Sequence, residues 1–168
     1  VDKSAIRPIA SAYICNMNVI SMDYQHWGRI AYKEAWDIQE KLLQENLDIK
    51  TSNRDKELAN DFSQAELTKN HFILCEHNPV FTLGKSGAIE NLLVNNQYLI
   101  DKGIEFFNTN RGGDITYHGP GQIVGYPIMD LRNWKRDVGA FVRGVEQVII
   151  DSLGDFGIRA ERVGKCTG

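Results

Sequence analysis

The residues most able to do chemistry lie in one run of the chain, RGGDITYHGPGQIVGYPIMDL (111–131). Gly112 and Gly113 allow backbone angles and close approaches that a side chain would forbid, and a Gly-Pro-Gly turn follows a few residues later. Arg111 offers a fixed cation for a phosphate or carboxylate, and His118 can carry a proton or donate to a carbonyl. Such a run suits an extended acyl or amide-containing ligand that lies along bare peptide.

A strand through this run would give it one polar face. Side chains alternate along a strand, so Asp114, Thr116 and His118 are expected to point to the same side. A structural hairpin is the alternative, because Gly-Pro-Gly turns are common. The run also has neither the spacing of a P-loop nor that of a dinucleotide-binding fingerprint.

The other candidates do not complete a catalytic set. Cys75 lies in an apolar, strand-like run, where a free cysteine is most often simply buried, and His77 is expected to be a structural histidine. Lys165 and Cys166 are adjacent, and a neighbouring cation lowers the pKa of a thiol. Adjacent side chains on a strand point to opposite faces, however, so this pair is not expected to act as a nucleophile.

Hydrophobic periodicity predicts the helices that position this run. Apolar residues recur at helical spacing in 27–46 and again from Val138 onward, where Asp137 is the expected N-cap. A short helix is expected at 95–103. Between the first helix and the next apolar run, residues 47–70 are predicted to be a polar surface excursion with at most one weak helical turn.

Short apolar runs bounded by turn residues predict the strands. They are expected at 11–20, 71–77, 80–84, 104–109, 121–131 and 157–163. Pro127 places the 121–131 strand at a sheet edge or makes it irregular, since proline cannot donate to the ladder. Several strands follow each other with only turns between them, so we predict an α/β (α+β) fold with a mixed, largely antiparallel sheet flanked by helices.

Composition limits the class of protein. The 168 residues are 42% hydrophobic and 24% charged, so residues 1–168 are expected to form a single domain. The net charge of −3 argues against a nucleic-acid binder with a basic face. Three widely spaced cysteines indicate a reducing, cytoplasmic compartment rather than a disulfide framework or a metal site. No apolar run approaches the roughly 20 residues that span a bilayer, so no membrane partner is expected.

Three segments carry a resemblance to a known family. Residues 111–131 closely resemble the signature of the octanoyltransferases of lipoate biosynthesis, formally lipoyl(octanoyl) transferases. WGRIAYKEAWDIQE (27–40) is similar to their N-terminal helix segment, and CEHNPVFTLGKSG (75–87) to their E-H-x-P-V-[YF]-T-x-G-[RK] segment. The resemblance spans roughly residues 10 to 168, and it is weakest in the polar excursion.

The resemblance implies a fold, an activity and partners. Members of the family move an octanoyl group from octanoyl-acyl carrier protein to a lysine of lipoyl domains, in 2-oxoacid dehydrogenases or the glycine-cleavage H protein. They share the mixed sheet of the biotin and lipoate protein ligases, use a cysteine thioester with a nearby lysine, and need no ATP or other cofactor. Their Arg-Gly-Gly-x-x-T-Y-H segment lines the substrate site. It carries over to Arg111, Gly112, Gly113, Asp114, Ile115, Thr116, Tyr117 and His118.

The chain departs from the family at its end. The family's lysine and cysteine lie in segments that would follow Gly168, so Lys165 and Cys166 precede the catalytic positions and should not be equated with them. The expectation is therefore a domain that lacks its C-terminal part, with no catalytic residue among these 168 and no transferase activity of its own.

Two other functions stay open. One is an ATP-dependent ligase of the lipoate or biotin type, although those enzymes typically carry S-G-G-G-x-V-[YF]-H-D where this chain has RGGDITYHGPGQ. The other is a non-catalytic module that binds acyl carrier protein or lipoyl domains.

Overall fold

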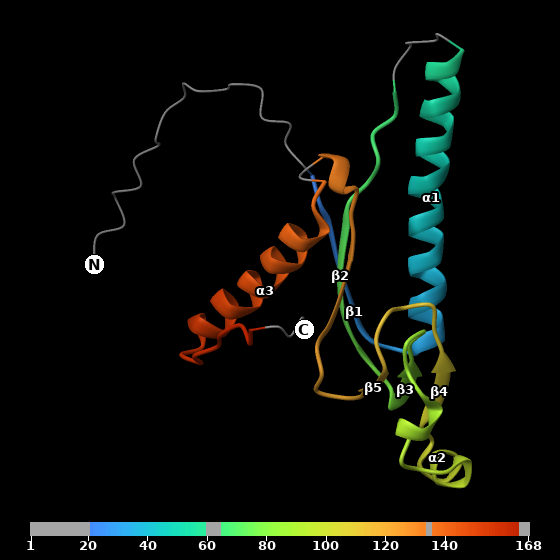
Figure 1. Cartoon of the computed structure of the whole chain (residues 1–168), viewed down its shortest axis with the longest axis vertical. Helices are drawn as coiled ribbons and strands as arrows, with labels where there is room; N and C mark the ends of the chain where they lie inside the picture. The colour runs from blue at the N-terminus through green and yellow to red at the C-terminus, as the bar shows by residue number, and fades with distance from the viewer. Residues whose placement is uncertain (1–20, 60–64, 134–135, 165–168) are drawn as a thin grey trace.

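The computed structural model describes residues 21–59, 65–133 and 136–164 (Figure 1). In chain order the elements are β1 (Asp23–Ile30), α1 (Tyr32–Leu58), β2 (His71–His77), β3 (Val80–Leu83), η1 (Ile89–Asn91), α2 (Asn96–Lys102), β4 (Glu105–Asn108), β5 (Ile115–His118), β6 (Val124–Ile128), η2 (Leu131–Asn133) and α3 (Val138–Asp155). Helix α1 stands beside the strands on one side, and α3 extends away from them on the other (Figure 1).

The described strands form two small mixed sheets. In the first, with the order β1-β2-β6, β2 pairs parallel with β1 and antiparallel with β6. In the second, with the order β4-β3-β5, β3 pairs parallel with β4 and antiparallel with β5. The predicted mixed sheet with flanking helices is therefore confirmed. Pro127 lies in β6, at the edge of its sheet and opposite Phe72, as its missing N–H requires.

The core is centred on β2. Alternate side chains of this strand (His71, Ile73, Cys75 and His77) are buried, and those between them are half-buried. This is the pattern of a central strand packed hard on one face. Val80 and Thr82 continue the buried row in β3.

Helix α1 begins and ends later than the periodicity predicts. Residues 27–30 belong to β1, because Arg29 and Ile30 resume the parallel ladder with β2 after an irregularity that follows His26, and the helix begins at Tyr32. It then runs through the polar stretch to Leu58, so the expected non-helical excursion is wrong for 47–58. Residues 65–70 have neither helical nor strand structure.

A polar stripe holds this second half of α1 in place. Asn46, Lys50 and Asn53 are spaced four and three residues apart, so they lie on one face of the helix. The Asn46 amide group exchanges two 2.8 Å hydrogen bonds with the backbone of Lys69. The Asn53 amide group does the same with the backbone of Glu66, at 2.7 and 2.9 Å. A search for apolar periodicity cannot detect a helix that is anchored by amide side chains.

Asp130 joins three parts of the fold. Its side chain is 2% exposed and pairs with Arg132 at 2.8 Å and with Lys50 of α1 at 3.3 Å. It also accepts a 3.0 Å hydrogen bond from the Thr68 hydroxyl, while its own N–H donates to the Asn70 side chain at 3.0 Å. The hydrogen bonds from Arg132 are the main reason that the pKa of Asp130 lies well below its usual value.

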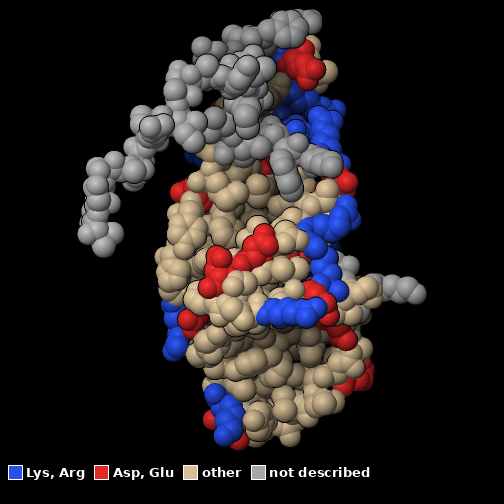
Figure 2. Space-filling view, turned by 90° about the vertical axis from the view of Figure 1, so that its left-hand side faces the viewer, with Lys and Arg blue, Asp and Glu red and all other residues tan. Residues whose placement is uncertain are grey.

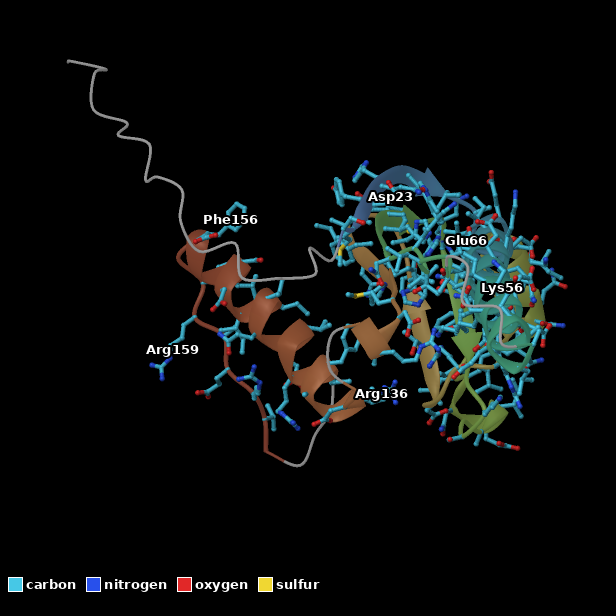
Figure 3. The ribbon with its side chains drawn as sticks, turned by 90° about the horizontal axis from the view of Figure 1, so that it is seen from above. Asp23, Lys56, Glu66, Arg136, Phe156 and Arg159 are labelled. Carbon is cyan, nitrogen blue, oxygen red and sulfur yellow. The ribbon has the colours of Figure 1, made fainter. Side chains whose placement is uncertain are left out.

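Helix α3 begins at Val138, as predicted. The Asp137 side chain caps it by accepting from the Ala140 N–H at 2.9 Å. None of its residues is buried, however, and Val148 and Ile149 are more than half exposed. Figure 3, where Phe156 and Arg159 are labelled, shows α3 standing apart from α1 and the sheets. On the face seen from the side of α3, acidic and basic side chains lie among the uncharged ones (Figure 2).

Two strand predictions have other outcomes. The expected strand at 157–163 is wrong, because residues 158–163 follow α3 without strand pairing. The expected strand at 11–20 lies outside the described residues.

The short helix α2 provides a test of local capping. The Asn95 side chain accepts from the Tyr98 N–H at 2.9 Å, and Gly103 ends the helix at φ 62°. Replacing Asn95 by alanine should lower the free energy of unfolding by about 1 kcal/mol, measured by urea denaturation. Gln97→Ala, which removes only an exposed side-chain contact with Asp101, is the control. Equal losses in both variants would contradict a capping role for Asn95.

Candidate functional site

The first residues of the glycine-rich run, 111–114, fold as a loop against the end of β3. Backbone hydrogen bonds hold it there, from the Thr109 N–H to the Leu83 oxygen (2.8 Å) and from the Lys85 N–H to the Arg111 oxygen (2.9 Å). The approach is very close at Gly84, where an added Cβ would lie 2.3 Å from the Gly113 oxygen. Only a glycine at this position, directly after β3, allows the loop to pack against the end of the strand.

Arg111 is occupied by the protein itself. Its Nε and Nη2 atoms donate to the Thr82 hydroxyl at 3.2 and 2.8 Å, and Nη2 also donates to the Thr82 carbonyl oxygen at 2.7 Å. Further bonds run from Nη2 to the Asp114 oxygen (2.8 Å) and from Nη1 to the Gly112 oxygen (3.0 Å). The predicted cation is thus present. Its donor hydrogens hold the loop to β3, except for one hydrogen on Nη1, since Nη1 carries two and makes one bond.

Asp114 is also bonded within the protein, and it does not form the polar face that was expected with Thr116 and His118. Its carboxylate accepts from the Ala88 N–H at 3.3 Å, from the Ile115 N–H at 2.7 Å and from the Asn91 side chain. It therefore ties the loop to η1 rather than pointing with Thr116 and His118 along one strand. The strand β5 begins at Ile115, so Asp114 precedes it and does not take part in the alternation of its side chains.

The remaining predicted residues divide between two faces. Thr116 pairs in register with Thr82, and Tyr117, which is 44% exposed, packs its ring 5.0 Å from that of Phe81 on the outer face. His118 lies on the other face, with its Nδ1 2.7 Å from the Gln122 side-chain oxygen. Within the described chain, the N–H groups of Gly112 and Gly113 meet no acceptor.

An aromatic cluster lies behind His118, and its members come from four elements. The Tyr32 ring stacks on His118 at 6.2 Å and on Phe107 at 5.5 Å, and it meets His77 edge-on at 5.3 Å. Tyr32 and Phe107 are residues that the sequence analysis did not select. Tyr32 falls within the helix-segment resemblance, but only the fold shows that the first turn of α1 reaches β5.

His77 is a buried, neutral member of this cluster. Its Nδ1 donates to the Ile30 oxygen at 3.0 Å, because a carbonyl can only accept. Its Nε2 consequently accepts from the Tyr126 hydroxyl at 2.7 Å. Burial, assisted by the nearby His118 ring, lowers the pKa of His77 and keeps it uncharged. The expectation of a structural histidine is confirmed.

Cys75 is not a nucleophile in this structure. Its side chain is 2% exposed, and burial raises its pKa to about 11. At pH 8 we expect iodoacetamide to alkylate Cys75 about a hundred-fold more slowly in the folded chain than in urea, because so little thiolate forms. Timed alkylation with peptide mass spectrometry measures both rates. Equal rates would mean that Cys75 is accessible and ionised.

A cleft of about 360 Å³ opens between α1, the loop and the end of β6. Apolar side chains line much of it, with Trp36, Leu43 and Leu47 from α1 and Pro127, Ile128 and Met129 from the other wall. Arg111 and Tyr32 supply polar groups. Both residues line this cleft; burial raises the pKa of Tyr32, and the charge of Arg111 partly offsets this effect. Glu40, Lys50 and Asp130 also line the cleft, so it combines an apolar wall with charged groups of both signs, of which Arg111 is the cation on the loop.

The structure brings the predicted residues 111–118 together at one loop and strand, but it divides their roles. Arg111 lines the cleft, Asp114 and Thr116 hold the loop and sheet, and Tyr117 points outward. Lys165 and Cys166 lie outside the described residues. Where side chains are described, no group of three or more His, Cys, Asp or Glu could hold a metal ion. Across the same residues, no helix has the length and apolarity needed to cross a membrane.

Solved structures share this architecture. LipL1 of P. falciparum in complex with lipoate matches with a TM-score of 0.51 at 17% identity, covering 86% of this chain and 39% of that one. A bi-partite lipoate protein ligase from Thermoplasma acidophilum matches with a TM-score of 0.52 at 16% identity, covering 86% and 49%. At these identities the likeness establishes the fold alone, which is that of the biotin and lipoate ligases.

The family follows from the sequence matches. A family model described as the lipoyl protein ligase A/B catalytic domain matches residues 31–167, and the chain belongs to that family. It is 53% identical over 141 residues to an octanoyltransferase of Solibacter usitatus and 46% identical over 142 residues to one of Flavobacterium psychrophilum. Each alignment covers 84% of this chain, and 56% and 59% of the relatives. The chain thus spans little more than half the length of these relatives.

Proposed function

We propose that the protein to which this chain belongs is an octanoyltransferase that modifies lipoyl domains. The donor would be octanoyl-acyl carrier protein, and the acceptors would be lipoyl domains of 2-oxoacid dehydrogenases and the glycine-cleavage H protein. The names of relatives at 53% and 46% identity support the reaction type. A cytoplasmic location fits an enzyme whose donor is a carrier protein of fatty-acid synthesis.

The observation that carries the proposal is the cleft. A volume of about 360 Å³ falls in the range of small-molecule sites, about 300–1,000 Å³. Its wall of leucine, isoleucine, methionine and tryptophan side chains suits a saturated acyl chain, whose burial is favourable at roughly 0.8 kcal/mol per CH₂ group. Arg111 suits the polar carbonyl end. We assign the substrate site to residues 111–118 together with this cleft.

The chemistry proposed is acyl transfer in two steps. A cysteine thiolate of the protein attacks the carbonyl carbon of the donor thioester, so one C–S bond forms and the carrier thiolate leaves. The neutral amine of the acceptor lysine then attacks the new thioester, a C–N bond forms, and the amine proton passes to the departing cysteine sulfur. Cys75 is not proposed for this role, because it is buried with a raised pKa. The family position for this cysteine would follow Gly168.

Mass spectrometry tests the transfer. The protein expressed from its complete gene should add one octanoyl group to a lipoyl domain when supplied with octanoyl-acyl carrier protein, and should form a hydroxylamine-labile octanoyl adduct on itself. The 168-residue chain, assayed beside it, should bind an octanoyl ligand without transferring it. No transfer by the complete protein would refute the proposed reaction.

A second set of reactions distinguishes the ligase alternative. The complete protein is supplied with free octanoate, the lipoyl domain and ATP in place of the acyl carrier protein. The proposed transferase gives no modified domain under these conditions. Modification that requires ATP would instead make the protein a ligase.

A further inference from the structure

Thr82 is a buried polar residue that the proposed reaction does not use. It lies in β3, the central strand of its sheet, between Phe107 on β4 and Thr116 on β5, and its exposed fraction is 0%. Its hydroxyl accepts from two nitrogens of Arg111 and donates to the Thr116 oxygen at 3.5 Å. A buried hydroxyl on a central strand is costly unless it is bonded, so its partners indicate its role.

Thr82 holds the guanidinium of Arg111 at two points. The hydroxyl and the carbonyl oxygen of this one residue both accept from Arg111, which fixes the plane of the guanidinium as well as its distance from β3. Every acceptor recorded for Arg111 is neutral, and it takes part in none of the ion pairs among the described side chains. Arg111 is therefore fixed in position at the lining of the cleft, and none of the described carboxylates, including Glu40 and Asp130 of the same cleft, forms an ion pair with it.

We infer that Thr82 is a positioning residue, which sets Arg111 so that its charge selects ligands carrying an acyl carbonyl. The inference rests on the proposed function, since it assumes that the cleft takes an octanoyl group. It also links two of the segments that resemble the family, because Thr82 lies in 75–87 and Arg111 in 111–131. Thr82 itself touches no ligand in this arrangement and acts through Arg111.

A matched pair of variants separates the hydroxyl from the shape of the side chain. Thr82→Val keeps the volume and branching of threonine and removes the acceptor, whereas Thr82→Ser keeps the hydroxyl and removes a methyl group. If Thr82 only filled space, serine would be the more harmful change. If it positions Arg111, valine would be the more harmful change for carbonyl recognition.

The readout is a preference between two ligands, measured by calorimetric or fluorescence titration. Octanamide carries the acyl carbonyl, and 1-chlorooctane has an eight-carbon chain without one. We expect the unsubstituted chain to bind octanamide about ten-fold more tightly than 1-chlorooctane, the effect of one hydrogen bond to a charged group. Thr82→Ser should keep this preference, and Thr82→Val should reduce it to about two-fold or less while binding 1-chlorooctane as before.

A second measurement keeps the inference testable whatever the ligand result. The Arg111 Nε–H should exchange slowly with solvent in the unsubstituted chain and in Thr82→Ser, and at least about ten-fold faster in Thr82→Val, as observed by NMR. Equal exchange in all three proteins, or an undiminished octanamide preference in Thr82→Val, would overturn the positioning role.

The two proposals fail in different ways. If the unsubstituted chain binds neither ligand but Thr82→Val still releases the Arg111 Nε–H, the proposed acyl site is wrong and Thr82 still fixes Arg111. If Thr82→Val does not fold, Arg111→Lys replaces it, since lysine keeps the charge but lacks the planar fork. Arg111→Lys should lose the octanamide preference and keep 1-chlorooctane binding. A lysine variant with the full preference would refute the need for a fixed guanidinium.

Discussion

Asp130→Ala is expected to lower the free energy of unfolding by about 3 kcal/mol, because it removes the shared partner of a buried ion-pair network. Asp130 is 2% exposed and holds Lys50 of α1, Arg132 and the Thr68 hydroxyl. Its loss leaves these groups without their common acceptor. Urea denaturation at pH 7 measures the effect. Asp151→Ala on α3 is the matched control, since Asp151 is bonded there to the Gln147 side chain in an exposed contact.

The same residue predicts a pH dependence. The pKa of Asp130 is lowered in the fold from its ordinary 3.8, mainly by hydrogen bonds from Arg132. A carboxyl group with a lowered pKa adds stability above its unfolded pKa, and this stability is lost as the pH falls toward the folded pKa. The difference in unfolding free energy between the unsubstituted chain and Asp130→Asn should therefore shrink steadily below about pH 4. A difference that is constant from pH 6 to pH 3 would rule out this linkage.

Gly84→Ala is expected to displace the glycine-rich loop from β3. The new Cβ would lie 2.3 Å from the Gly113 oxygen and 2.8 Å from the Gly112 oxygen, and both of these are backbone atoms that cannot rotate away. We expect a loss of about 2 kcal/mol in unfolding free energy and at least a ten-fold loss of octanamide affinity, since Arg111 moves with the loop.

Gly154→Ala provides the control for this change. An added Cβ at Gly154 of α3 meets nothing within 4 Å, so the same substitution there should leave ligand binding unchanged. Unfolding curves and octanamide titrations on both variants give the comparison. Retention of full octanamide affinity by Gly84→Ala would show that the loop does not need this close approach.

Sequence patterns predicted the elements whose cause is local. The strand at 71–77 has the expected bounds, because a short apolar run between turn signals describes a central strand well. The helix at 138–155 begins after its predicted cap, Asp137, and the helix at 96–102 lies within the predicted 95–103. Local sequence patterns gave wrong element boundaries where contacts between distant residues determine the structure. Residues 27–30 belong to β1 because Arg29 and Ile30 pair with β2, and α1 continues past residue 46 along a polar stripe.

The candidate site shows the same division. Sequence patterns located the candidate site at 111–118. They could not show that Arg111 forms hydrogen bonds with Thr82 of β3, or that Asp114 forms them with Asn91 of η1. Nor did they reveal Tyr32 or Thr82, whose importance depends on residues that are distant in sequence. The type of a residue indicates which bonds it can make. Only the folded structure shows which partner it bonds to.

The parallel pairing of β1 with β2 has a consequence for how the chain reaches this structure. Asp23 and His71 meet across that ladder although 48 residues separate them, and α1 fills most of the interval. Helical turns form in a microsecond or less, whereas a parallel pair must first close the long segment between its strands. We therefore expect α1 to form early and to bring the two strands together. The rate of folding would then be set by closure of this crossover rather than by the helix.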